Sequence, residues 1–239
     1  MTLLDTAEMY GEGRSEALIG RAISGLDRER LTLVSKVYPH NAGRDRIFGC
    51  CEQSLRRLGV DRLELYLLHW RGSVPLAETV ECMEELRARG RIAAWGVSNF
   101  DVEDLQALWD AGGTACAVNQ LLYHLGSRGI EVELLPWMER HGVALMAYCP
   151  LAQGGRLRRG LLEHPTVTKL AASLGATPAQ LLLAFALRGA RTIAIPKASS
   201  PAHTGENAAA SLLGLDDDAW AALDAAFPAP RRRLPLDIQ

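Results

Sequence analysis

Residue types that can move a proton follow three short apolar runs of this chain. Asp5, Lys36 and His69 each come at or just after the end of such a run, and Tyr10 lies a few residues past the first. An isolated tyrosine has a pKa of about 10. A neighbouring ammonium lowers that pKa, and a carboxylate holds the ammonium charged and in place. A histidine at the same place can hydrogen-bond a carbonyl oxygen. This set predicts chemistry that protonates a carbonyl oxygen while a hydride attacks the carbon.

A second group of polar residues follows the later apolar runs. Asn99 and Gln120 can hydrogen-bond an amide, and Tyr148 can stack on a flat ring. Lys197 precedes Ser200–Pro201, a pair typical of a helix N-terminus, and such a terminus beside a lysine is an anion site. Taken singly each residue is more often structural, but together they predict a nicotinamide dinucleotide site.

The lysine usage of the chain is unusual. Only Lys36, Lys169 and Lys197 occur among 26 basic residues. Arginine serves elsewhere as the general cation, so each lysine is a candidate for a role that needs a compact charge.

Short apolar runs alternate with amphipathic helical stretches, which is typical of βαβ units and a parallel sheet. The predicted strands are Thr2–Leu4, Leu31–Ser35, Leu63–Leu68, Ile92–Val97, Ala115–Val118, Val143–Ala147 and Thr192–Ile195. The predicted helices are Ser15–Ile23, Arg44–Leu58, Leu76–Arg89, Val102–Trp109, Glu131–His141, Thr166–Leu174, Pro178–Leu187, Pro201–Leu213 and Asp216–Phe227. No GxGxxG motif follows a strand, which disfavours a doubly wound dinucleotide fold. The fold class expected is α/β, a (β/α)₈ barrel, although such a barrel needs an eighth strand.

Composition excludes several classes of protein. The chain has 239 residues, 48% hydrophobic and 23% charged, and a formal net charge of −2, so a basic surface for nucleic acid or anionic membrane is not indicated. No apolar run reaches the roughly 20 residues of a membrane helix, and residues 1–10 do not resemble a signal peptide. Five cysteines without a CxxC motif favour reduced thiols and a cytoplasmic location. We expect one domain over residues 1–239.

Six motifs resemble the aldo-keto reductase superfamily in order and spacing. They are DTAEMYG (Asp5–Gly11), VSKV (Val34–Val37), LLHW (Leu67–Trp70), GVSNF (Gly96–Phe100), VNQLLYH (Val118–His124) and IPKASSPAH (Ile195–His203). Three more stretches resemble the bacterial members that reduce methylglyoxal and related small aldehydes. These are YHLGSRGIE (Tyr123–Glu131), AYCPLAQGGRL (Ala147–Leu157) and PAP (Pro228–Pro230).

The resemblance implies an NADPH-dependent reductase of small carbonyl compounds, monomeric, without a metal. Its catalytic tetrad falls on Asp5, Tyr10, Lys36 and His69, with Tyr10 as proton donor and His69 orienting the carbonyl. Apart from the resemblance, the place of Trp70 directly after His69 suits either a wall of the substrate pocket or packing under a loop. The cofactor residues it implies are Ser98, Asn99, Gln120, Tyr148, Leu151, Lys197, Ser199, His203, Glu206 and Asn207.

Two departures from the family pattern bear on the cofactor. Ala198 stands where many relatives carry serine, and His203 where many carry arginine. Both weaken the expected grip on a 2′-phosphate, so NADH is also possible. The resemblance further implies that the hairpin and first β/α unit, which precede the DTAEMYG motif in relatives, are missing from this chain.

Three other functions compete with the reductase. Lys36 can be read as the Schiff-base lysine of an aldolase, but Asp5 beside it would keep the amine charged. A metal-dependent hydrolase needs paired ligands, and the six histidines show no such spacing near a strand end. The third alternative is a non-catalytic NADP(H)-binding regulatory protein or an inactive, truncated reductase.

Overall fold

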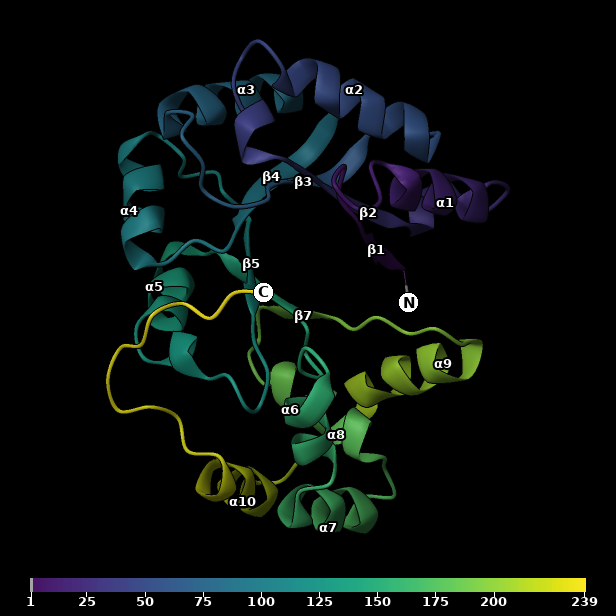
Figure 1. The fold of residues 1–239 in the computed structure, drawn as a ribbon, viewed down its shortest axis with the longest axis vertical. Helices are drawn as coiled ribbons and strands as arrows, with labels where there is room; N and C mark the ends of the chain where they lie inside the picture. The colour runs from purple at the N-terminus through teal and green to yellow at the C-terminus, as the bar shows by residue number, and fades with distance from the viewer. Residues whose placement is uncertain (1) are drawn as a thin grey trace. The chain divides into compact units, whose positions relative to one another are not determined.

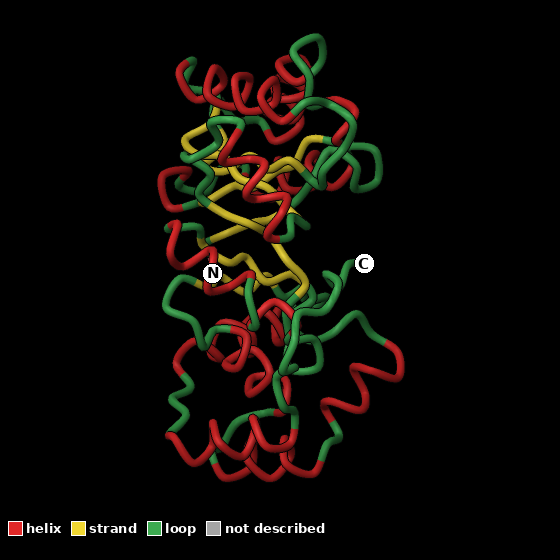
Figure 2. The backbone as a smooth tube through the Cα atoms, turned by 90° about the vertical axis from the view of Figure 1, so that its left-hand side faces the viewer, coloured by secondary structure: helices red, strands yellow, loops and turns green. Residues whose placement is uncertain are grey.

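A computed structural model describes residues 2–239, which fall into two compact units, residues 2–119 and 120–239. Strands and helices alternate along the chain (Figures 1 and 2). The seven described strands are β1 Leu3–Asp5, β2 Thr32–Val37, β3 Leu63–Leu68, β4 Ile92–Ser98, β5 Val118–Leu122, β6 Ala144–Tyr148 and β7 Thr192–Ile195. The described α-helices are α1 Arg14–Ile23, α2 Ile47–Leu58, α3 Leu76–Ala88, α4 Val102–Asp110, α5 Leu134–His141, α6 Gly155–Leu162, α7 Pro165–Ser173, α8 Pro178–Ala186, α9 Pro201–Ala209 and α10 Asp217–Ala226. Short 3₁₀ turns are η1 Arg28–Arg30, η2 Pro39–Asn41, η3 Gly129–Glu131 and η4 Ala210–Leu212.

In the first unit, four strands pair in parallel in the order β1-β2-β3-β4. The register sets Asp5 opposite Val34 and Lys36 opposite Leu67. Parallel strands end at one edge of a sheet, so the residues that close β1, β2 and β3 come together there. Figure 1 shows α1, α2 and α3 along the outer face of these strands.

Burial on both faces explains the sequence of the central strands. β2 and β3 are buried along most of their length, as parallel strands covered on both faces are. Outside them, α1 crosses α2 closely at Gly20, where a Cβ would lie 2.5 Å from the carbonyl oxygen of Arg57. Only glycine therefore permits this approach.

The second unit carries the order β5-β6-β7, and β6 pairs with β7 in parallel. α8 begins with a capping box between Thr177 and Gln180 and buries most of its residues, which follows from its apolar sequence. The C-terminal tail lies on this unit, where Ser127 Oγ donates to Asp237 Oδ2 at 2.5 Å and Cys149 Sγ donates to Gln239 Oε1 at 2.8 Å. No single helix of residues 2–239 is long and apolar enough to cross a membrane; the bent pair α7 and α8 passes that test only when taken together.

The prediction for the fifth strand was wrong in position. β5 runs over Val118–Leu122, whereas the sequence indicated Ala115–Val118. Asn119 and Gln120 therefore lie inside the strand and not after it. A buried strand tolerates these amides because they are hydrogen-bonded: Asn119 Nδ2 donates to the carbonyl oxygen of Phe100 at 2.8 Å, and Gln120 Nε2 donates to Met146 Sδ at 3.1 Å.

Other predicted strand and helix boundaries differ from the observed ones by a few residues, and one helix was not predicted. Lys36, Ser98 and Tyr148 are the penultimate or last residues of their strands and not the first residues after them. The helix predicted over Glu131–His141 is η3 followed by α5, and α6 was not predicted. α6 starts at two glycines, Gly154 and Gly155, whose φ angles are 115° and 62°. Positive φ angles of this kind leave no trace in the pattern of apolar residues, so the start of α6 was not predicted.

A buried carboxylate between α1 and the sheet leads to a test of stability. Glu16 is entirely buried and accepts hydrogen bonds from Arg57 Nε at 2.6 Å and Ser35 Oγ at 2.5 Å. Arg57→Ala leaves that charge unpaired, so we expect the free energy of unfolding in urea to fall by about 3 kcal/mol. Arg87→Ala breaks an exposed pair with Glu84 and should cost below about 1 kcal/mol. Equal losses in the two variants would contradict this account.

Candidate active site

Lys36 is the centre of the candidate site in the first unit. Its side chain is 0% exposed, and Nζ lies 2.7 Å from Asp5 Oδ2, whose side chain is 13% exposed. Nζ also donates to the carbonyl oxygen of Thr6 at 2.8 Å and to Tyr10 Oη at 3.3 Å. An ammonium has three protons, and these three acceptors use all of them. The buried lysine is thus aimed at the oxygen of Tyr10.

His69 faces the ring of Tyr10 from the end of β3. Their ring centroids are 5.6 Å apart at 77°, an edge-on contact. Burial, and then the charge of Lys36, lower the pKa of His69 to about 3. The imidazole is therefore neutral at physiological pH, with one N–H to donate and one nitrogen to accept. Its Nδ1 is buried and finds no hydrogen-bond partner among residues 2–239.

Asn99, the first residue after β4, hydrogen-bonds the backbone of His69. Asn99 Nδ2 donates to the carbonyl oxygen of His69 at 3.3 Å and to Ser98 Oγ at 3.2 Å. Asn99 has a φ angle of 58°, in the left-handed region that a non-glycine residue seldom adopts and that is over-represented at functional sites. Six of the residues predicted from the sequence, Asp5, Tyr10, Lys36, His69, Ser98 and Asn99, are therefore brought together in this unit.

An aromatic group extends from His69 over the turn after β2. Trp70 lies beside His69, with centroids 4.9 Å apart, and contacts the edge of Tyr38 at 5.7 Å. Tyr38 in turn contacts His40 at 4.8 Å. Trp70 was predicted from the sequence as a site residue, whereas Tyr38 and His40 were not. Their place directly after the strand that carries Lys36 was the signal available for finding them.

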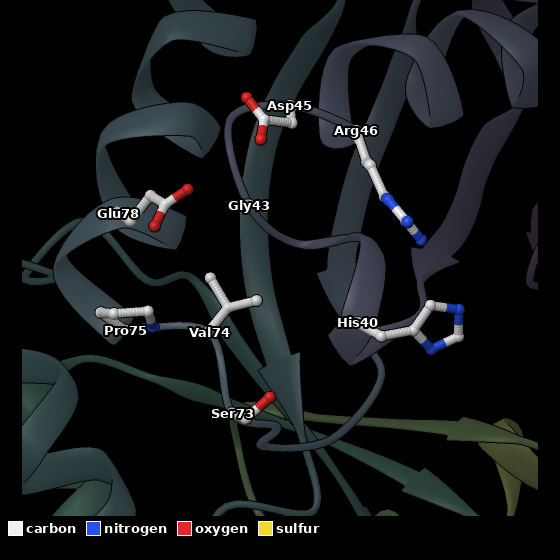
Figure 3. Close-up of a pocket in the computed structure, with 8 residues that line it drawn as sticks. All are labelled: His40, Gly43, Asp45, Arg46, Ser73, Val74, Pro75 and Glu78. Carbon is white, nitrogen blue, oxygen red and sulfur yellow. The ribbon is translucent and has the colours of Figure 1, made fainter.

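A hollow of ≈ 330 Å³ lies in the same unit, between the loop after β2 and the start of α3 (Figure 3). Its lining includes His40, Asp45, Arg46 and Glu78. None of the four predicted catalytic side chains lines it, so it is separate from the Lys36 cluster. In Figure 3 the carboxylates of Glu78 and Asp45 lie on the side between α3 and the loop, whereas the His40 ring and the Arg46 side chain extend away from α3.

The remaining predicted residues belong to the second unit. Gln120 is buried in β5, Tyr148 ends β6 half-buried, and Leu151 is buried in the turn that follows. Lys197 and Ser199 are exposed after β7. His203, Glu206 and Asn207 occur at a spacing of three and four residues on α9, which sets them on one face of the helix.

The N-terminus of α9 has the features predicted for an anion site. Ser200 is the N-cap, its Oγ accepting the His203 N–H at 3.2 Å, and Pro201 is at the first helical position. The first turn has no acidic residue, so the positive end of the helix dipole is not neutralised there. Within residues 2–239 no group of three or more histidine, cysteine or acidic side chains is placed to hold a metal ion.

Comparison with known proteins identifies the family of this chain. The profile of the Aldo/keto reductase family matches residues 1–227. The chain belongs to the aldo-keto reductase family. It is 52% identical over 239 residues to "Methylglyoxal reductase YeaE" of Escherichia coli K12, covering 100% of this chain and 84% of that protein. A crystal structure of an aldo-keto reductase from Klebsiella pneumoniae in complex with NADPH matches with a TM-score of 0.96 and 54% identity, again over 100% and 84%.

More distant relatives agree with this assignment. The uncharacterized oxidoreductase YtbE of Bacillus subtilis is 33% identical over 228 residues, covering 93% of this chain and 78% of that protein. The aldo-keto reductase Tm1743, solved with the inhibitor epalrestat, has a TM-score of 0.85 at 38% identity, covering 92% and 80%. These matches confirm the (β/α)₈ class and the oxidoreductase class predicted from the sequence.

The depressed pKa of His69 predicts how the stability of this aldo-keto reductase changes with pH. A histidine in the unfolded chain has a pKa of about 6.5, so between this pH and about 3 the unfolded chain binds a proton at His69 that the folded chain does not. Stability must therefore fall as the pH falls through this range. Between pH 7.5 and 5, His69 should account for about 2 kcal/mol of the loss.

His69→Gln removes this proton and tests the prediction. Urea unfolding at pH 7.5, 6 and 5 should show a shallower loss of stability for the variant than for the parent chain, whatever their difference at pH 7.5. Burial also lowers the pKa of His124, but that contribution is common to both proteins. Parallel curves would contradict a neutral, buried His69.

Proposed function

We propose that this protein reduces small aldehydes and ketones to alcohols, with 2-oxoaldehydes such as methylglyoxal among its substrates and NADPH as the reductant. One observation supports the proposal most strongly: a fully buried lysine donates one of its three protons to the phenol oxygen of Tyr10. The relative from E. coli is called a methylglyoxal reductase, and the Klebsiella relative was crystallised with NADPH. Both relatives support an NADPH-dependent reductase of small carbonyl compounds.

The chemistry of the donor set fits NADPH. The first turn of α9, free of acidic residues and preceded by Lys197 and Ser199, suits an anionic phosphate. We assign Lys197, Ser199 and His203 to the 2′-phosphate and Glu206 and Asn207 to the adenine. Ser98, Asn99 and Gln120 carry the amide and hydroxyl groups that a carboxamide needs, Tyr148 offers an aromatic face, and Leu151 an apolar one. Because Ala198 and His203 replace stronger phosphate ligands of relatives, NADH should also be accepted, more weakly.

When bound, NADPH supplies the hydride. The protein must then deliver a proton to the carbonyl oxygen, and Tyr10 is the donor in this proposal, acting as a general acid. Its oxygen accepts a hydrogen bond from Lys36 Nζ at 3.3 Å, which leaves the phenol proton free to point away toward substrate. Once that proton has moved, the same ammonium faces the resulting phenolate and stabilises its charge.

His69 orients the carbonyl in this mechanism. A neutral imidazole carries one N–H, which can donate to the substrate oxygen without competing as an acid. Asn99 fixes the backbone of His69 through its carbonyl oxygen, and Trp70 packs against the ring. We assign Trp70 to the wall of the substrate pocket, since it is 38% exposed and packs beside the ring of His69.

The aldolase alternative needs a free amine at Lys36. All three protons of its ammonium are engaged, one by a carboxylate at 2.7 Å, and a protonated amine is not a nucleophile. The reductase accounts for this arrangement, and the aldolase does not.

Tyr10→Phe tests the proposal directly. Loss of the proton donor should lower the rate of methylglyoxal-dependent NADPH oxidation by about 10²–10⁴-fold, while NADPH still binds, as measured by quenching of protein fluorescence. Turnover close to that of the parent chain would remove Tyr10 from the mechanism.

Tyr66→Phe is the matched control. It makes the same change at a buried tyrosine whose hydroxyl finds no hydrogen-bond partner within residues 2–239, so the rate should not change. If the parent chain binds NADPH but turns over no aldehyde or ketone, the non-catalytic binding protein is the better account.

A further inference from the structure

Glu8 is an acidic side chain on the loop between Asp5 and Tyr10, and the mechanism above leaves it without a role. Its Oε1 accepts the Tyr38 N–H at 2.7 Å and the Asn41 Nδ2–H at 3.1 Å. Its own N–H donates to the carbonyl oxygen of Lys36 at 3.3 Å. Glu8 thus connects the loop after β1 to the end of β2 and to the 3₁₀ turn η2.

The loop on one side of Glu8 carries the proton donor. The Tyr10 N–H donates to the carbonyl oxygen of Ala7 at 3.1 Å, so Glu8 lies within the tight turn that presents Tyr10. A shift of the Glu8 backbone would therefore move the phenol relative to Lys36.

The turn on the other side carries the aromatic group. Tyr38, whose N–H is held by Glu8, contacts Trp70 edge-on at 5.7 Å, and Trp70 packs against His69 at 4.9 Å. Asn41, the second donor, closes η2 behind Tyr38 and His40. Glu8 therefore couples the proton donor to the side chains that border the substrate.

The two N–H donors to Glu8, from Tyr38 and Asn41, are neutral and reach the same oxygen. The thiol of Cys50 also hydrogen-bonds the Glu8 side chain, and its pKa is raised to about 11, so this group is neutral too. What this junction needs is an acceptor at a fixed place, and a negative charge is not required. An amide oxygen of the same side-chain length would serve.

We propose that Glu8 is a positioning residue of the reductase: its carboxylate sets the separation between Tyr10 and the Tyr38–Trp70 wall, and thereby the orientation of the bound carbonyl. This proposal rests on the proposed function. Small displacements of reacting groups lower rates strongly, so the effect should be seen in the handling of the carbonyl substrate.

Glu8→Ala tests the role. We expect KM for methylglyoxal to rise and kcat to fall, with kcat/KM reduced about 10–100-fold, while KM for NADPH changes by less than about twofold. A purely structural role would lower the fraction of active enzyme and hence kcat, but it would leave KM for the carbonyl unchanged. An unchanged carbonyl KM overturns the proposal.

Two further variants sharpen the test. Glu8→Gln keeps the acceptor and should restore KM to within about threefold of the parent value; a Gln variant as impaired as the Ala variant would also overturn the proposal. Asp27→Ala is the structural control, because Asp27 accepts the Glu29 N–H at 3.2 Å and caps η1 before β2, at the opposite end of that strand. It should leave the carbonyl KM unchanged.

Asn41→Ala covers the case in which Glu8→Ala does not fold. It removes one of the two N–H bonds to Glu8 Oε1 and should raise the carbonyl KM by about threefold; no rise would count against the proposal. In the double variant the two effects should not add, since they remove the same contact. The Tyr10→Phe result separates failures: an inactive Tyr10→Phe with a normal Glu8→Ala refutes only the role of Glu8.

Discussion

A lysine ammonium that is closed off from water needs an acceptor for each of its three protons, and this requirement governs the candidate site. Lys36 is 0% exposed and its acceptors are a carboxylate, a backbone carbonyl and a phenol. Each comes from the end of β1 or the loop behind it, so β1, β2 and that loop must meet in one register. A buried ammonium proton without an acceptor would destabilise the folded state, because the hydrogen bond to water lost on burial would not be replaced.

The same register brings His69 and the β4 end to the cluster. Because β1 to β4 are parallel and adjacent, their last residues share one edge, and each strand contributes a different chemical group there. Burial that keeps His69 neutral also gives Lys36 its low-dielectric surroundings. Two hydrogen-bonded residues of the loops also hold the cluster. Asn99, whose φ angle of 58° is strained, bonds the backbone of His69 after β3. Glu8, in the loop after β1, bonds the backbone of Tyr38 after β2.

Much of this was predictable from sequence, because strand ends are visible as the places where apolar runs stop. Those stops alone assign Asp5, Lys36 and His69 to one edge of the sheet, and the Ser200–Pro201 pair marks a helix start. β5 was misplaced because Asn119 and Gln120 look like the end of a strand, whereas partners distant in the chain satisfy their amides. The place of Tyr38 after the second strand was visible in the sequence, but the contacts that Tyr38 and Glu8 make were not, because they depend on loop conformations and hence on tertiary packing.

The claim on which the account depends is that the Asp5–Lys36 pair serves the reaction at Tyr10 and not the stability of the fold. The double variant Asp5→Asn/Lys36→Met replaces a buried ion pair by neutral side chains of similar size, a change that proteins often tolerate without loss of stability. The measurement is its rate of methylglyoxal-dependent NADPH oxidation beside its urea unfolding midpoint. The account predicts that the double variant folds cooperatively, with a midpoint lowered only modestly because the Thr6 carbonyl loses its donor, and that its rate is lower by about 10²–10⁴-fold. A folded double variant with a rate near that of the parent would contradict it.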